Sequence, residues 1–466
     1  MTFPFELDPS QSAPIYRQIY QRFRESISDG RLRPGDRVPA VRALAAELNL
    51  ARGTVDAAYQ LLIGEGYLVA RGAAGTVVTP QLAPISSPML HAPATSTPYQ
   101  ATHSGTMPLE LQMGLPALDA FPRKLWTRLA GRQLRQAGFE GLVYPDARGY
   151  APLRAAIASY LGISRGITCH PDQVFVCAGY RACIDLISHT LMRQGDRCWL
   201  EEPGYFMARN ALLGSGAQLV PVPVDDQGLD VAEGIARAPD AHFALVTPTH
   251  QSPLGMSLSL PRRLALLDWA NRQGSWIIED DYDSEYRYRG KPLPALKSLD
   301  QQGRVLYTGT FSKVLFPGLR LAYLVVPIEQ HPAFALQADR LHNHCPHLLQ
   351  ATVTAFLNEG HFARHLKKMR SLYARRRQWL VDALLQQFGD RLQINTQAGG
   401  MHVVAGLCDG DDVELAQRAR AAGIAIEPLS RWYLETTPRQ GLVLGFTNIA
   451  SADQASAVAR RLAQIM

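Results

Sequence analysis

The chain has 466 residues, of which 47% are hydrophobic and 19% charged, a globular composition with room for two to three domains. No apolar run approaches the ~20 residues of a membrane span, the N-terminus lacks the order of a signal peptide, and the six scattered cysteines indicate neither a disulfide framework nor a metal site, so we expect a cytoplasmic protein without a membrane partner. The net charge of +6 permits an anionic partner without establishing one, because residues 1–80 carry nine arginines and eight acidic residues.

The first eighty residues show three helical patterns followed by two short strands. The predicted helices cover residues 14–29, 41–48 and 52–64, and the predicted strands cover residues 67–70 and 76–78. This order is that of a winged helix-turn-helix. A small helical domain without a partner would show the same pattern, so the order of elements alone does not decide between them.

The positions of three arginines favour a DNA-binding head. Arg42 begins the second predicted helix, Arg52 begins the third, and Arg71 lies at the tip of the wing. Helix N-termini and wings are the places at which such domains meet phosphates and base edges, and arginine can bind guanine through two hydrogen bonds.

The segment GRLRPGDRVPAVRALAAELNLARGTVDAAYQLLIGEGYLVARGAAGTVV resembles the GntR family of bacterial repressors. This resemblance implies that the head binds double-stranded operator DNA and that the contacting residues are Arg42, Arg52, Thr54, Arg71 and Gly72. The family often has Ser or Thr where this chain has Ala40, Ala51 and Gly53, so the operator sequence is not predicted.

The composition changes to Pro, Ser, Thr and Ala, with almost no charge, from Pro80 to about Met107. Such a segment cannot bury a core, and we expect a semi-extended tether. The predicted organisation is therefore a DNA-binding domain at residues 1–79, a linker at 80–107 and a large domain at 108–466.

The large domain alternates strand-like and helix-like segments, which predicts an α/β fold with a mainly parallel sheet and helices on both faces. The predicted strands are residues 174–178, 198–202, 243–247, 276–280, 304–307 and 322–326, and helices such as 180–193 and 261–272 lie between them. In such sheets the ligand loops follow the carboxyl ends of the strands.

Polar and aromatic residues follow four of these strands. Gly179 and Tyr180 begin a helix whose amides suit a phosphate, and Tyr205 lies on a turn from which it could stack on a flat ring. His250 lies in a proline-broken loop, and Asp280 ends an apolar strand, where a buried carboxylate could pair with a protonated ring nitrogen. The alternatives are a helix start that binds nothing, a tyrosine that only packs and, for the adjacent carboxylates, a solvated turn or a metal site.

Lys313, in the loop GTFSKVLFPGLR, has two interpretations. It is either a snorkelling surface lysine or an amine in a dry pocket, where a lowered pKa lets it form a Schiff base with an aldehyde. In the second interpretation Thr310 and Arg320 could hold an anionic group close to that aldehyde. A lysine, a buried carboxylate, a stacking ring and a phosphate cradle are together the parts that pyridoxal 5'-phosphate needs.

From about Glu110 onward the chain resembles fold-type I aminotransferases, on the blocks YPDARGYAPLRAAIASYL, EEPGY, TPTHQSPLG, IIEDDYDSEYRY and GTFSKVLFPGLR. The resemblance implies a smaller C-terminal α+β subdomain, Lys313 as the Schiff-base residue, and Asp280 as the partner of the ring nitrogen. It also implies that Tyr282 bonds the 3'-oxygen of the cofactor and that Tyr205 stacks on its ring. The phosphate ligands that it implies are Gly179, Tyr180, Thr310, Arg320 and, from the neighbouring subunit of a head-to-tail homodimer, Tyr144.

A GntR-like head on an aminotransferase-like body resembles the MocR subfamily of regulators over nearly the whole chain. This implies a transcription regulator that binds pyridoxal phosphate and senses a small amine, an amino acid or the cofactor itself; the alternative is a working aminotransferase. The last predicted strand, GLVLGFTNI, lacks the late arginine with which such enzymes bind the substrate carboxylate, so we expect no physiological turnover. The candidate effector ligands are His250 and Arg431, of which Arg431 could also be a surface residue.

Overall fold

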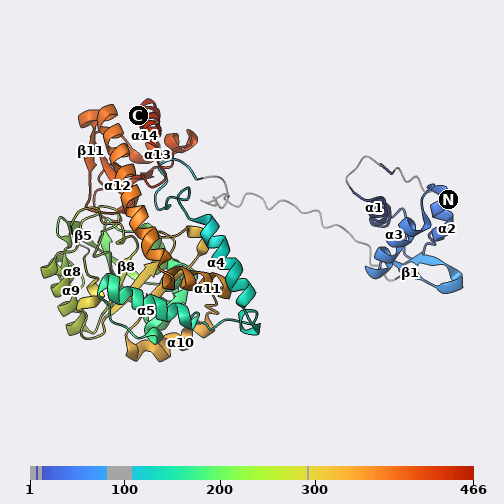
Figure 1. Cartoon of the computed structure of the whole chain (residues 1–466), viewed down its shortest axis with the longest axis horizontal. Coiled ribbons are helices and arrows are strands. Elements are labelled where there is room, and N and C mark those ends of the chain that lie inside the picture. The colour runs from blue at the N-terminus through green and yellow to red at the C-terminus, as the bar shows by residue number, and fades with distance from the viewer. Residues whose placement is uncertain (1–6, 9–12, 81–107, 291–292) are drawn as a thin grey trace. The chain divides into compact units, whose positions relative to one another are not determined.

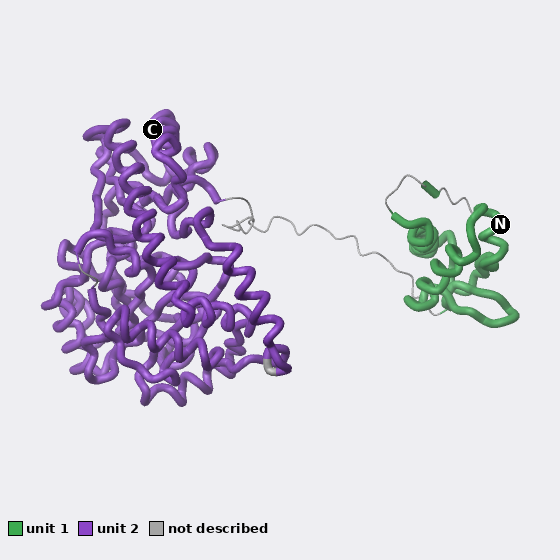
Figure 2. Tube along the Cα trace, viewed as in Figure 1, with its two compact units in different colours: residues 1–105 green, residues 106–466 purple. Residues whose placement is uncertain are grey.

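The computed structural model of the chain describes residues 7–8, 13–80, 108–290 and 293–466. They belong to two compact units, residues 1–105 and 106–466 (Figure 2). The predicted linker, apart from Pro80, lies outside the described residues. Within the described ranges no helix combines the length and the apolar character that crossing a membrane requires.

The first unit is a winged helix-turn-helix, as predicted (Figure 1). Its elements are α1 (Ile15–Ser28), α2 (Val41–Glu47), α3 (Arg52–Gly64) and the antiparallel strands β1 (Leu68–Ala70) and β2 (Thr76–Val78). The apolar stripe of α1 packs on α3, where the rings of Phe23 and Tyr59 meet edge to face with centroids 5.4 Å apart. The Tyr59 hydroxyl donates to the carbonyl oxygen of Pro39 at 2.8 Å, so the buried phenol has a partner.

The second unit is built around an eight-stranded sheet with the order β3-β10-β9-β8-β7-β4-β5-β6. The strands are β3 (Val174–Cys177), β4 (Arg197–Glu202), β5 (Gln218–Asp225), β6 (Gly228–Leu229), β7 (Phe243–Val246), β8 (Trp276–Asp281), β9 (Val305–Thr310) and β10 (Ala322–Val325). β10 runs antiparallel to β3 and β9, and β6 runs antiparallel to β5, whereas the other neighbouring pairs are parallel. The carboxyl ends of β3, β9, β8, β7 and β4 therefore share one edge of the sheet with the start of β10.

Helices cover both faces of this sheet. Alternate residues of a strand point to opposite faces, and they belong to different apolar clusters. Side chains such as Phe175 and Leu324 pack with α6, α7 and α10, whereas Val174 and Val325 pack with α5 and α11 on the opposite face. The helices are α4 (Arg123–Gln136), α5 (Ala151–Arg165), α6 (Tyr180–Leu191), α7 (Phe206–Gly214), α8 (Val231–Arg237), α9 (Leu260–Gln273), α10 (His331–Arg340) and α11 (His347–Asn358).

The C-terminal part is the smaller α+β subdomain that was predicted (Figure 1). The long helix α12 leads into a four-stranded antiparallel sheet with the order β11-β12-β14-β13, and α14 packs along α12. The elements are α12 (His361–Phe388), β11 (Leu392–Asn395), β12 (His402–Leu407), α13 (Asp412–Ala421), β13 (Glu427–Pro428), β14 (Gly441–Gly445) and α14 (Ala452–Ile465).

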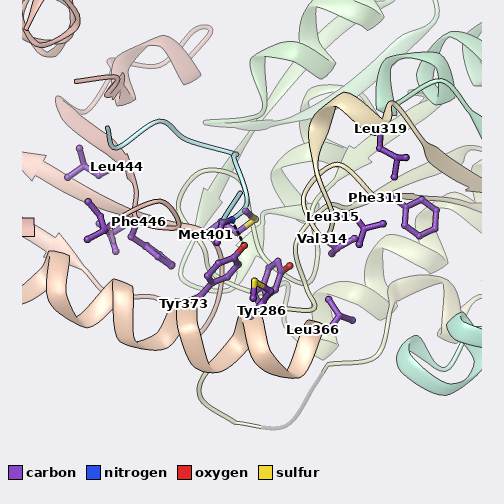
Figure 3. Packing of buried hydrophobic residues seen from close by; sticks show 14 of the residues in the cluster. Tyr286, Phe311, Val314, Leu315, Leu319, Leu366, Tyr373, Met401, Leu444 and Phe446 are labelled. Atoms are coloured by element: carbon purple, nitrogen blue, oxygen red, sulfur yellow. Dashed lines mark hydrogen bonds between the residues drawn. The ribbon is translucent and has the colours of Figure 1, made fainter. Parts of the chain in front are cut away.

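The loop between β9 and β10 is held by the core on both sides of Lys313. Phe311, Val314 and Leu315 are each at most 2% exposed and pack in one cluster with Tyr373 of α12 and with residues of the C-terminal sheet (Figure 3). Burying three large apolar side chains within five residues leaves this loop little freedom. The lysine between them therefore has a defined position at the edge of the sheet.

Candidate functional site

Lys313 is an amine with reduced basicity. Burial lowers its pKa, although the nearby carboxyls of Asp283 and Asp280 work against that change. Its Nζ donates a hydrogen bond to the carbonyl oxygen of Gly114 at 2.9 Å. Gly114 has φ +77°, and a Cβ at that position would lie 2.4 Å from Nζ, so only glycine leaves room for the amine. A lysine in such surroundings is suited to react as a nucleophile.

Asp280, near the end of β8, is a buried carboxyl that lacks a cationic partner among the described residues. Burial raises its pKa to about 8, and the neighbouring carboxyl of Asp281 adds to this rise. The Tyr180 hydroxyl lies close enough to counter part of the rise, although it makes no hydrogen bond of good geometry within the described residues. A protonated ring nitrogen is the kind of partner that such a carboxyl requires.

The start of α6 forms a cradle suited to a phosphate. Gly179 precedes the helix with φ +99°, and a Cβ there would lie 3.0 Å from Nη2 of Arg320, so glycine keeps this space open. The Arg320 guanidinium donates to the carbonyl oxygen of Ala178 at 3.1 Å, and Thr310 accepts a hydrogen bond from the amide of Ser312. Because the first amides of a helix lack partners within it, these amides and the nearby Arg320 cation would suit an anion such as a phosphate.

The two tyrosines predicted to contact the cofactor ring, Tyr205 and Tyr282, define what we call the ring-binding side of the site. Tyr205 follows β4, and its ring centroid lies 6.1 Å from that of Tyr180 and 5.8 Å from that of Trp432. Tyr282 follows β8, and its hydroxyl lies 3.0 Å from Nδ1 of His250. The predicted residues that follow β3, β4, β8 and β9, with the arginine that precedes β10, therefore gather at one edge of the sheet.

Tyr144 lies apart from these residues in the single chain. Its side chain is 93% exposed, in a loop that also exposes Phe139, Leu142 and Val143 by 62% to 90%. The ring comes within 6.3 Å of that of His344, which is not a predicted site residue. A role for Tyr144 in the site of its own chain has no support from this geometry, whereas a role across a subunit interface stays a prediction.

The two predicted effector ligands have different surroundings. His250 is 7% exposed and contacts Tyr282 and Asp283, so it belongs to the interior behind the ring-binding side. Arg431 keeps a side-chain exposure of 58%, lies 3.7 Å from the carboxylate of Glu427 and has its guanidinium carbon 5.8 Å from the ring centroid of Phe206. Arg431 is thus close to the aromatic group around Tyr205. Among the described residues, the carboxylate nearest its guanidinium is 3.7 Å away, beyond hydrogen-bond distance.

The predicted DNA-contacting residues lie at the starts of α2 and α3 and at the wing tip; their contact with DNA stays a prediction. Arg42 is in the first turn of α2, Arg52 begins α3, and both side chains are exposed. Arg71 and Gly72 lie at the wing tip, where Gly72 has φ +56°, and Thr54 is half-buried in the first turn of α3. Within the described residues none of the three guanidinium groups forms an ion pair, which leaves their charge available to a polyanion.

Sequence reasoning missed Gly114 and the role of Asp283. Gly114 lies 199 residues before Lys313, and nothing in its local sequence indicates that its carbonyl oxygen meets the lysine. Asp283 belongs to the acidic run that follows β8, but the run itself does not reveal that this carboxylate pairs with His250. The donor set as a whole fits pyridoxal 5'-phosphate: Lys313 for the aldehyde, Asp280 for the ring nitrogen and the α6 cradle for the phosphate.

Each of the two units matches a known protein family. The family model for class I and II aminotransferases matches residues 119–441, and the model for bacterial regulatory proteins of the gntR family matches residues 15–78. The "Probable rhizopine catabolism regulatory protein MocR" of Rhizobium meliloti is 38% identical over 455 residues, which are 95% of this chain and 92% of that protein. The "HTH-type pyridoxine biosynthesis transcriptional regulator PdxR" of Corynebacterium glutamicum is 33% identical over 95% of this chain and 94% of its own.

Among solved structures, the body is similar to LysN, an alpha-aminoadipate aminotransferase from Thermus thermophilus complexed with N-(5'-phosphopyridoxyl)-L-leucine. The TM-score is 0.70 at 29% identity, over 77% of this chain and 91% of that chain. The aminotransferase match begins beyond the head, whereas the two regulators match both units. The chain therefore belongs to the MocR-type branch of the GntR family of DNA-binding transcriptional regulators, with a body of the class I and II aminotransferase family that takes pyridoxal 5'-phosphate as its cofactor.

Proposed function

We propose that this regulator holds pyridoxal phosphate on Lys313 and changes its affinity for operator DNA when a small primary amine enters the same site. The observation that carries the proposal is the surroundings of Lys313: a lysine of lowered pKa, bonded to Gly114 and facing two buried carboxyls, in a chain whose other unit is a DNA-binding head. The cofactor, when bound, supplies an aldehyde that bonds reversibly to a primary amine.

The charges around Lys313 supply a reason for the two states to differ. When the lysine is free, its ammonium group can compensate the buried carboxylate of Asp283; when its nitrogen is engaged, Asp283 loses that partner, whereas Asp280 would face the ring nitrogen of the cofactor. A ligand can shift an equilibrium only through its differential affinity for the two states, and this change of charge inside a buried site provides one. Such a device requires amine binding but no turnover.

Arg431 is the proposed ligand for an anionic group on the effector. The segment around it is held by two buried carboxylates from different parts of the body. Asp412 accepts from the amide of Ser430 at 2.9 Å, and Glu202 accepts from the amides of Leu434, Glu435 and Thr436 at 2.7, 2.8 and 3.1 Å. An arginine on a segment that is fixed in this way, with an exposed side chain, is suited to an amino acid or another amine that carries a negative charge.

The proposed functional unit is a homodimer. The loop that contains Phe139, Leu142, Val143 and Tyr144 exposes a run of large apolar side chains, which a second copy of the chain would cover. In a head-to-tail dimer Tyr144 would then reach the phosphate cradle of the neighbouring subunit. Sedimentation of the full chain tests this part: a monomer at micromolar concentration, unchanged by the cofactor, would contradict it.

The proposal is tested by measuring absorbance and DNA binding on the same samples. The probe duplex is one that the full chain selects from a random library, and the amines tried are glycine, β-alanine and L-glutamate, with acetate as a control that lacks an amine. We expect a visible absorbance band on addition of pyridoxal phosphate, and we expect at least one amine to change both this band and the affinity for the duplex. Amines that alter the spectrum of the loaded protein but never its DNA affinity would contradict the regulatory link.

Lys313→Ala tests the lysine itself, and it should abolish the visible band. The matched control is Lys297→Met, because Lys297 is another lysine whose pKa is lowered by burial, but it is paired with Asp300 at 3.4 Å and lies outside the site. An unchanged spectrum in Lys313→Ala, or a lost band in Lys297→Met with the fold intact, would show that the covalent bond forms elsewhere.

A further inference from the structure

Behind the ring-binding side, His250 contacts two residues of the loop that follows β8. Its Nδ1 lies 2.9 Å from Oδ1 of Asp283 and 3.0 Å from the hydroxyl of Tyr282. Asp283 is fully buried and His250 is 7% exposed. One imidazole nitrogen therefore faces a carboxylate and a phenol at the same time, although it can carry either a proton or a lone pair, but not both.

The distances decide which of these it carries. A nitrogen and a carboxylate oxygen 2.9 Å apart need a proton between them, because two acceptors at that distance repel each other. Imidazole is a stronger base than a carboxylate, so this proton belongs to Nδ1. The phenol oxygen of Tyr282 therefore accepts from this N–H group, and its own proton points away from His250. The hydroxyl of Ser252 also bonds to Tyr282 and acts to lower the pKa of the phenol, as a donor to the same oxygen does.

The imidazole ring is closely packed on the side of Gly400. Gly400, with φ +87°, approaches so closely that a Cβ there would lie 2.2 Å from Cε1 of His250. A turned ring would also place a carbon atom against the buried carboxylate of Asp283. On the far side of the ring, Nε2 has no hydrogen-bond partner among the described residues, so the contacts with Asp283 and Tyr282 are the ones that orient it.

The other titratable groups around this cluster are Asp280, Glu201, Tyr288, Lys313 and His402. Glu201 acts on Tyr282 through its charge, and burial raises the pKa of its carboxyl to about 7. Asp280 and Lys313 belong to the cofactor site itself. The His402 ring lies 5.8 Å from that of His250, its Nε2 is 2.8 Å from the carbonyl oxygen of Pro253, and burial lowers its pKa to about 4. His402 is therefore neutral near pH 7, does not contact Tyr282 and offers a matched control.

We propose that His250, oriented by Asp283, is a positioning residue that makes the Tyr282 hydroxyl a hydrogen-bond donor toward the ring oxygen of the bound cofactor. The inference rests on the proposed function, since it takes pyridoxal phosphate on Lys313 as the ligand that Tyr282 faces. A donor at the ring oxygen stabilises negative charge there and favours the form of the loaded protein that has lost a proton. The pair thus sets the pH at which the loaded protein changes colour.

The experiment is a pH titration of the visible absorbance of the full chain loaded with pyridoxal phosphate. Tyr282→Phe should raise the midpoint by about one pH unit, the size expected for losing one hydrogen bond to a charged group. His250→Leu should raise the midpoint by a similar amount. His250→Asn, whose amide N–H can take the place of Nδ1–H, should stay near the wild type, and so should His402→Asn.

The decisive comparison is the double variant Tyr282→Phe/His250→Leu. If His250 acts through Tyr282, the double variant has the midpoint of Tyr282→Phe alone. If His250 acts only through its own charge, the His250→Leu shift persists in the Phe background and the inference is wrong. Should His250→Leu fail to fold, nitrogen-15 NMR of histidine-labelled wild type still decides the matter: a proton found on Nε2 of His250 and not on Nδ1 overturns the inference.

The outcome also separates this inference from the proposed function. A wild-type protein that stays colourless with pyridoxal phosphate, or a Lys313→Ala variant that keeps the band, removes the proposed function and the inference together. If the wild type is coloured and titrates, but His250→Leu leaves the titration midpoint unchanged, only the inference is removed.

Discussion

Replacing Asp280 by asparagine is expected to stabilise the cofactor-free protein while weakening its hold on pyridoxal phosphate. Asp280 is 4% exposed, and burial together with the neighbouring carboxyls raises its pKa from 3.8 to about 8. Asparagine has nearly the same shape but cannot ionise. It therefore removes the cost of placing a charge in the interior, together with the carboxylate that would pair with the ring nitrogen.

The size of the effect follows from these two pKa values. When a carboxyl has a higher pKa in the folded than in the unfolded protein, the protein loses stability as the pH rises, because the unfolded chain releases that proton first. With 3.8 for the unfolded chain and about 8 for the folded one, the cost is about 2 kcal/mol at pH 5, about 4 kcal/mol at pH 7 and about 6 kcal/mol at pH 8.5. The stability difference between Asp280→Asn and the wild type should therefore widen from pH 4 to pH 8 and then level off.

Urea unfolding at pH 5, 7 and 8.5, at one protein concentration and without the cofactor, measures this difference. All six tryptophans lie beyond residue 108, so their fluorescence reports on the second unit alone. With saturating pyridoxal phosphate the order should reverse, because a ligand stabilises the variant that binds it more tightly. A stability difference that is the same at all three pH values would refute the reasoning.

Three further predictions concern the cofactor site, the head and the ion pairs below the site. Gly114→Ala should weaken cofactor loading at least tenfold, because the new Cβ would lie 2.4 Å from Lys313 Nζ. Gly410→Ala is the control for backbone strain, since Gly410 has φ +100° but no neighbour within 4 Å. Equal cofactor loading in the two variants would contradict the clash. Arg52→Ala should lower operator affinity, measured by fluorescence anisotropy, by about 10-fold or more and leave the visible band intact; loss of both properties would contradict two independent units. Arg165→Met should lower the free energy of urea unfolding by about 3 to 5 kcal/mol, because it leaves the carboxylates of Asp281 and Glu285, 2.9 and 3.2 Å from the guanidinium, without their cation. A loss below about 1 kcal/mol would show that these two carboxyl groups do not depend on the arginine.

Features that depend on neighbouring residues were predictable from the sequence. The apolar spacing from residue 14 to 29 predicted α1 (Ile15–Ser28), and the third helix, predicted from about residue 52 to residue 64, is α3 (Arg52–Gly64). The alternation of strands and helices predicted the mainly parallel sheet, because each such unit buries one face in the same way wherever it occurs. The lysine loop was likewise predicted after a strand, since apolar runs on both sides of it show where the strands lie.

The sequence alone determined the two kinds of unit, the order of elements in the head, six strands of the large sheet and the candidate lysine, because propensity and apolar spacing act over a few residues; β5 and β6 were missed. Only the tertiary structure decided that β10 runs in the reverse direction, which brings Arg320 to Gly179, and that the Gly114 carbonyl meets Lys313 across 199 residues. The perturbed pKa of Asp280 was decided there too, since burial depends on which segments cover a carboxyl and leaves no trace in the residues beside it.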